Sequence, residues 1–108
     1  MKVLMLNGSP HPEGCTFTAL SEVKAALNVA GVDADIIHCG PQTAVCTNCG
    51  HCRRSDPPRC VYDDVLNTVL AKLDEYDGLV LGSPVHYASA SGLATAFFDR
   101  LFWIAGSR

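Results

Sequence analysis

Short apolar runs alternate with helix-like patterns along the chain, and this alternation predicts the fold class. Residues 2–8 and 78–84 are short, mostly apolar runs that end at Gly-Ser-Pro turns, and residues 33–39 alternate before they become apolar. Runs of this length and composition are typical of strands buried in a parallel sheet. We therefore expect three strands, one in each segment.

Three other segments have the period of a helix. Residues 18–31 repeat apolar side chains on one helical face and end at a glycine, and residues 63–76 do the same behind two aspartates that favour a helix N-terminus. Residues 93–106 are apolar around most of the helix circumference, which favours contact with another chain. Strands and helices in this order predict an α/β fold with helices on both faces of a parallel sheet.

The length of 108 residues predicts a single domain, residues 1–108, with a long polar loop at residues 40–60. A doubly wound sheet usually contains more strands than the three expected here. We therefore expect that the chain is cut short at its C-terminus relative to the complete fold, or that another chain covers the open edge of its sheet.

Charge and hydropathy exclude some classes of function. The net charge of -3 argues against a nucleic-acid-binding protein, which needs a basic surface. No apolar run approaches the roughly 20 residues of a membrane-spanning helix, and the N-terminus lacks the features of a secretory signal. We therefore expect a cytoplasmic protein with reduced thiols, no membrane segment and no nucleic-acid partner.

Two loops follow predicted strands and are expected at the same edge of the sheet, where open α/β folds bind ligands. The first offers the hydroxyls of Ser9, Thr16 and Thr18 before a helix, which is typical of an anion or phosphate site. An ordinary turn with Thr16 or Thr18 as the helix N-cap is an equally supported alternative. The second loop carries His86 and Tyr87, which could contact a flat aromatic ligand.

The most specific motif is C-x2-C-x2-C-x7-C in the loop at residues 40–60. This spacing suits the ligands of an iron–sulfur cluster, whereas structural zinc sites usually have two separated pairs. A dithiol redox pair and cysteines without a cofactor remain open alternatives. The four candidate ligands are Cys46, Cys49, Cys52 and Cys60, and the arginines that could offset their charge are Arg53, Arg54 and Arg59.

Taken together, the two strand-end loops, the cysteine motif and the segment "GSPVHYASASGLATAFFDRL" resemble the flavodoxin-fold NAD(P)H-dependent FMN reductases, and within them the iron–sulfur flavoproteins. The resemblance spans essentially the whole chain and implies a flavodoxin-like fold, of which only the first three β-α units are present. It implies that the first loop binds the FMN phosphate and that the second loop lies along the isoalloxazine ring. The implied FMN contacts are Ser9, His11, Thr16, Phe17, Thr18, Pro84, Val85, His86 and Tyr87, with Gly92 at the turn into the last helix.

The same resemblance implies a 4Fe-4S cluster on the four cysteines and electron exchange between this cluster and FMN. NAD(P)H is a possible electron donor, another small molecule or protein is the acceptor, and a homodimer or homotetramer is expected. No acid–base catalytic residues are expected, because the flavin carries the chemistry. The alternatives are an NAD(P)H-dependent FMN or quinone reductase without a cluster, and a non-enzymatic zinc-binding or dimerising module.

Overall fold

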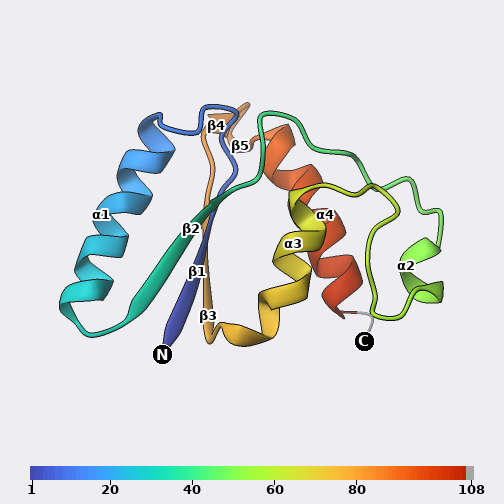
Figure 1. Ribbon diagram of the computed structural model, residues 1–108. Helices are drawn as coiled ribbons and strands as arrows, with labels where there is room; N and C mark the ends of the chain where they lie inside the picture. Colours follow the sequence, from blue (N-terminus) through green and yellow to red (C-terminus); the bar gives the residue numbers. More distant parts are fainter. Residues whose placement is uncertain (107–108) are drawn as a thin grey trace.

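The computed structural model describes residues 1–106 and contains a three-stranded parallel sheet with the order β2-β1-β3 (Figure 1). The strands are β1 (Lys2–Asn7), β2 (Asp33–His38) and β3 (Gly78–Gly82). The last residue of β1, Asn7, is in register with the last residue of each neighbour. The carboxyl ends of all three strands therefore lie at one edge of the sheet, as the sequence predicted.

The helices pack on both faces of this sheet. Helix α1 (Cys15–Val29) covers one face, and α3 (Val65–Lys72) and α4 (Gly92–Gly106) lie on the other side (Figure 1). A single strand serves both layers, because side chains alternate along it: Val3 and Met5 of β1 pack with α1, while Leu4 and Leu6 pack with α3 and α4. This is the flavodoxin-like α/β arrangement that the sequence predicted.

Two predicted helices have different ends in the structure. Helix α1 begins at Cys15, three residues earlier than expected, so Thr16 and Thr18 belong to the helix. Helix α3 begins after Asp64, whose side chain accepts a hydrogen bond from the Leu66 N–H at 3.2 Å. The pattern at residues 73–75 continues as the 3₁₀ turn η1 (Leu73–Glu75).

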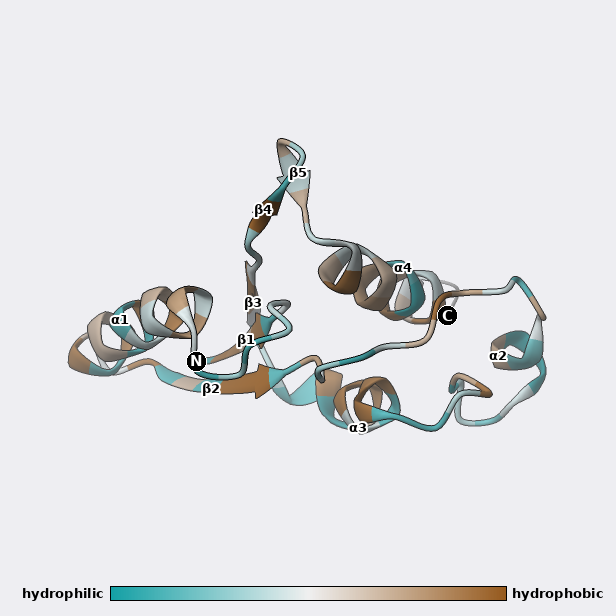
Figure 2. Ribbon diagram, turned by 90° about the horizontal axis from the view of Figure 1, so that it is seen from above, coloured by the Kyte–Doolittle hydropathy of each residue, from teal (hydrophilic) through white to brown (hydrophobic). Residues whose placement is uncertain are grey.

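The segment at residues 85–92, predicted as a loop, contains a hairpin of β4 (Val85–His86) and β5 (Ser89–Ala90), which projects from the end of the sheet (Figure 2). Tyr87 and Ala88 form its turn with φ values of 50° and 60°. Two-residue hairpin turns require positive φ and usually contain Asn or Gly. The sequence offers neither at this turn, which is why the hairpin was not predicted. A second unpredicted element is α2 (His51–Arg54), a short helix in the cysteine loop.

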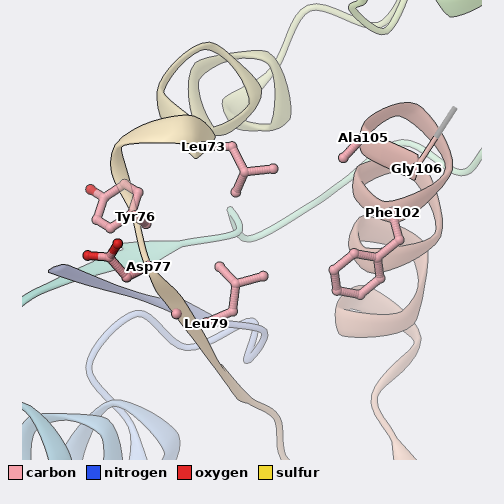
Figure 3. A pocket seen from close by; sticks show the side chains of 8 residues that line it. Leu73, Tyr76, Asp77, Leu79, Phe102, Ala105 and Gly106 are labelled. Carbon is pink, nitrogen blue, oxygen red and sulfur yellow. The ribbon is translucent and has the colours of Figure 1, made fainter. Parts of the chain in front are cut away.

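Among residues 1–106, strand β3 pairs only with β1, so its other side is an edge of the sheet. An apolar groove of about 660 Å³ lies between this edge and α4 (Figure 3). Leu79 and Phe102 line it and are each partly exposed. That another chain covers this edge stays a prediction, and the groove is the surface that it would cover. Within residues 1–106, no helix is long and apolar enough to cross a membrane.

Candidate functional site

Buried polar side chains shape the first loop, which connects β1 to α1. The Asn7 side chain accepts a hydrogen bond from the Ser9 N–H at 3.0 Å and donates one to the Pro12 carbonyl at 3.3 Å. The Ser9 hydroxyl accepts from the His11 N–H at 3.1 Å. Nε2 of His38 lies 2.7 Å from the Ser9 carbonyl oxygen, so this nitrogen carries the proton, because a carbonyl can only accept. The loop is therefore fixed by contacts from the ends of two strands.

The N-terminus of α1 opens from this loop without a side-chain cap. Its N-cap is Gly14, which has no side chain to offer. The alternative in which Thr16 or Thr18 caps the helix is therefore wrong, and Thr18 instead donates its hydroxyl to the Gly14 carbonyl at 3.2 Å. Because the first N–H groups of a helix have no partners within it, an uncapped first turn can donate to an anion.

An open groove of about 530 Å³ lies between the start of α1 and the end of β3. Cys15 and Thr16 from the start of α1 line one part, and Pro84 and Val85 after β3 line another. Glycine makes this approach possible: a Cβ placed on Gly82 would lie 2.9 Å from Cγ2 of Thr16. The groove is therefore built by close packing of the sheet edge against α1.

Two serines tie the second loop to the first. The Ser91 hydroxyl donates to the Gly8 carbonyl at 2.9 Å and accepts from the Ala94 N–H at 3.1 Å, so it also caps α4. The Ser83 hydroxyl accepts from the Ser91 N–H at 2.9 Å. This network holds the start of α4 against both strand ends.

The four cysteines of the motif line a second, smaller hollow, between the cysteine loop and α4. Cys60 is buried and Cys52 is half-buried, while Cys46 and Cys49 are exposed. Cys60 is held through its backbone: its N–H donates to the Asn67 side chain at 2.8 Å, and its carbonyl accepts from the same amide at 3.0 Å. The motif therefore places four thiols around one space.

The wall of this hollow that α4 provides contains a buried charge and an aromatic ring. Arg100 donates to the Cys60 sulfur at 3.4 Å, to both carboxylate oxygens of Asp64 and to the Thr43 hydroxyl. Burial lowers the pKa of Arg100, but the hydrogen bonds and the negative charge of its partners outweigh this effect and raise the pKa, so the guanidinium stays cationic. The Arg53 guanidinium lies 4.5 Å from the ring centre of Trp103 and joins the loop to the helix.

Comparison with known proteins identifies the family. The family of NADPH-dependent FMN reductases matches over residues 1–108. The chain belongs to this family. Its curated relatives are named iron–sulfur flavoproteins: one from Methanocaldococcus jannaschii is 32% identical over 93% of this chain and 51% of its own length.

Two further relatives are also named iron–sulfur flavoproteins. One protein of Archaeoglobus fulgidus is 31% identical over 93% of the chain and 48% of its own length, and one of Methanosarcina thermophila is 31% identical over 93% of the chain and 52% of its own length. These matches support the iron–sulfur flavoprotein branch of the FMN reductase family. The chain spans about half the length of the curated relatives that it matches.

The predicted FMN contacts of this FMN reductase family member fall into three groups. Thr16, Pro84 and Val85 line the groove, and Ser9 organises the first loop. The groove-lining residues do not include the other predicted contacts, His11, Phe17, Thr18, His86, Tyr87 and Gly92. Tyr87 projects on the exposed hairpin, and Gly92 begins α4 with open space where a Cβ would stand. Their contact with FMN stays a prediction.

The fit of a cluster to the cysteine hollow depends on the donor set. Within residues 1–106, no three His, Cys, Asp or Glu side chains converge closely enough to hold a single metal ion. All six cysteines there are free thiols in the structure. A cluster of four irons spreads its thiolate ligands over more space than one tetrahedral zinc ion does. Four thiols around one hollow therefore fit a cluster in kind and in number.

Sequence reasoning missed three residues of these sites. Asn7 ends an apolar strand and gives no local signal. Ser91 precedes α4, where serine is a preferred N-cap, and this signal could have found it. Arg100 lies among apolar residues of α4, next to Asp99, and the sequence does not show that it is the buried one of these two charges. The arginines predicted to neutralise the cysteine loop, Arg53, Arg54 and Arg59, are all exposed.

Cys39 is a core residue, as predicted from its place at the end of β2. Burial raises the pKa of its thiol to about 12. We expect alkylation of Cys39 by iodoacetamide at pH 8 to be roughly a thousandfold slower than alkylation of the exposed Cys49 in iron-free protein, because the thiolate is the reactive form. Peptide mass spectrometry over time measures both rates. Equal rates in the folded protein would contradict the placement of Cys39, and equal rates in urea are the expected control.

Proposed function

We propose that this chain is the FMN-binding part of a flavin-dependent oxidoreductase, in which FMN at the groove exchanges electrons with a 4Fe-4S cluster on Cys46, Cys49, Cys52 and Cys60. The observation that carries this proposal is that one helix, α4, contributes to both sites. Helix α4 begins at the strand-end loops, and its third turn forms a wall of the cysteine hollow. Ala94 and Arg100 are about 9 Å apart along this helix.

The chain's own residues bind the flavin and orient it. The uncapped first turn of α1 and the hydroxyl of Thr16 offer donors to the FMN phosphate, and the loop fixed by Asn7 and Ser9 sets their position. Pro84 and Val85 give the ring an apolar wall. The flavin itself supplies the hydride and single-electron chemistry. The protein needs no acid–base pair for this role.

The names of the relatives support the cluster, and the four thiols around one hollow agree with them. NAD(P)H is the proposed donor, and a small molecule or protein exchanges electrons with the cluster. An FMN reductase without a cluster is the second candidate. It is supported by the family match, whose description names NADPH and FMN and no cluster.

We also propose that the protein forms a homodimer or homotetramer. Phe102 and Trp103 of α4 are each nearly half exposed, at 45% and 44%. Large apolar side chains that are exposed to solvent favour association. Sedimentation of the purified protein measures this state independently of the flavin.

A comparison of FMN with riboflavin tests the flavin site. Fluorescence titration is expected to show FMN binding at least tenfold more tightly, because only FMN carries the phosphate that the first turn of α1 can receive. Thr16→Val removes a hydroxyl donor and should narrow this difference while leaving riboflavin affinity nearly unchanged. Equal affinity for both flavins would contradict a phosphate site in the first loop.

A further inference from the structure

Arg100 is the only charged side chain that is fully buried among residues 1–106, with a relative exposure of 1%. It lies on α4, between the apolar residues that pack against the sheet and against α3. Removing a cation from water costs several kcal/mol even after the protein relaxes around it. The position of this charge therefore requires specific partners.

Three partners surround the guanidinium. Both of its terminal nitrogens donate to the Asp64 carboxylate, one of them also to the Thr43 hydroxyl at 2.7 Å and the other to the Cys60 sulfur at 3.4 Å. Asp64 at the same time caps α3. The cation is thus fixed between the start of α3 and the cysteine hollow.

Stability alone does not account for this arrangement. Nε of Arg100 is buried and has no hydrogen-bond partner in the described part of the chain, and a buried donor left unpaired costs about 1–3 kcal/mol. Buried ion pairs are often no more stabilising than apolar residues of similar volume. Packing does not explain this buried charge, whereas the hydrogen bond to the Cys60 sulfur connects it to the cysteine hollow.

We infer that Arg100 is a positioning residue that holds Cys60 at the buried end of the cysteine hollow and raises the reduction potential of the cluster proposed there. The inference rests on the proposed function. Hydrogen bonds to ligand sulfurs and net charge set the potentials of iron–sulfur clusters, and both act here in the same direction. A cation stabilises the form with one more electron, most strongly where water is excluded.

The exposed arginines of the same loop provide the contrast. Arg53, Arg54 and Arg59 face solvent, where salt and water screen their charge. Arg100 is buried and bonded to a candidate ligand. Its effect on the potential is therefore expected to exceed theirs, although all four carry the same charge.

The test is a redox titration of the cluster in the anaerobically purified chain and its variants, followed by electron paramagnetic resonance. Arg100→Gln is expected to increase the ratio of oxidised to reduced cluster at a fixed potential at least tenfold, which corresponds to about 59 mV for a one-electron couple. Arg54→Gln is the matched control and should change this ratio much less.

Asp64→Asn is expected to shift the ratio in the opposite direction. Asparagine keeps an N-cap for α3 but no longer offsets the charge of Arg100. A residue that only supported the fold would not produce shifts of opposite sign in two contacting partners. If Arg100→Gln does not fold, Asp64→Asn provides the test. An unchanged or lowered reduction potential in Asp64→Asn would overturn the inference.

The outcomes separate the two proposals. An iron-loaded Arg100→Gln protein with an unchanged potential would overturn the inference and leave the proposed function intact. Wild-type protein that holds no iron under any anaerobic condition would refute the proposed cluster and the inference with it.

Discussion

Replacing Cys49 with serine is expected to reduce the iron content of the anaerobically purified protein at least tenfold and to leave its bound flavin unchanged. Cys49 is exposed and lines the hollow that the four motif cysteines share. A serine at this position would keep the size of the side chain but lose the thiolate that iron–sulfur clusters require. Because Cys49 lies outside the hydrophobic core, its loss should not affect folding. Iron, zinc and flavin are measured on the same sample.

Cys15→Ser is the matched control for this experiment. Cys15 is also an exposed thiol, but it begins α1 and lies outside the cysteine loop. Its replacement should leave the iron content unchanged. Equal iron in the wild type and Cys49→Ser would contradict the assignment of the motif as cluster ligands. Zinc in the wild type that is lost in Cys49→Ser would favour the zinc-binding alternative.

The second large effect is expected from Gly8→Ala, which should destabilise the protein and weaken FMN binding together. A Cβ on Gly8 would lie 2.5 Å from Cβ of Ala94 and 2.9 Å from the Gly82 carbonyl oxygen. No side chain can rotate away from these contacts, so α4 and the strand ends must separate. Overpacking of this kind typically costs about 1–3 kcal/mol. The change also moves the hydrogen bond of Ser91 to the Gly8 carbonyl, which joins the two strand-end loops beside the groove.

Denaturant unfolding and an FMN titration of the same variant measure the two effects. Gly106→Ala is the control, because a Cβ there would meet nothing within 4 Å. It should leave both the free energy of unfolding and FMN affinity close to the wild type. Gly8→Ala with wild-type stability would contradict the close approach of β1 and α4. Lost stability with unchanged FMN affinity would show that the groove does not depend on this contact.

Local sequence patterns predicted the layers of this fold because each element buries a regular set of apolar residues. Leu4 and Leu6 alternate with Val3 and Met5, so β1 could be read as a strand buried on both faces. The positions of helix ends were harder to predict from the sequence, since each depends on a single contact. Asp64 starts α3 by accepting one N–H bond, and Gly14 starts α1 without any side-chain cap.

The candidate sites were predictable where their residues are close in sequence. The spacing of Cys46, Cys49 and Cys52 places them on one loop, and the structure puts them around one hollow. The partners of Cys60 were not predictable in this way. Arg100 is forty residues further along the chain and reaches the sulfur only because α3 and α4 pack together. The same holds for Ser91, which bonds to Gly8 across 83 positions.

The most direct test of the proposed function is an absorption spectrum of the anaerobically purified chain, with flavin and iron quantified on the same sample. We expect flavin bands with a broad additional absorption in the visible region and about four iron atoms per chain, as a 4Fe-4S cluster on four cysteines requires. Flavin without iron would contradict the cluster and favour the cluster-free FMN reductase. Neither flavin nor iron, after reconstitution with both, would contradict the proposal that this chain binds FMN and a cluster.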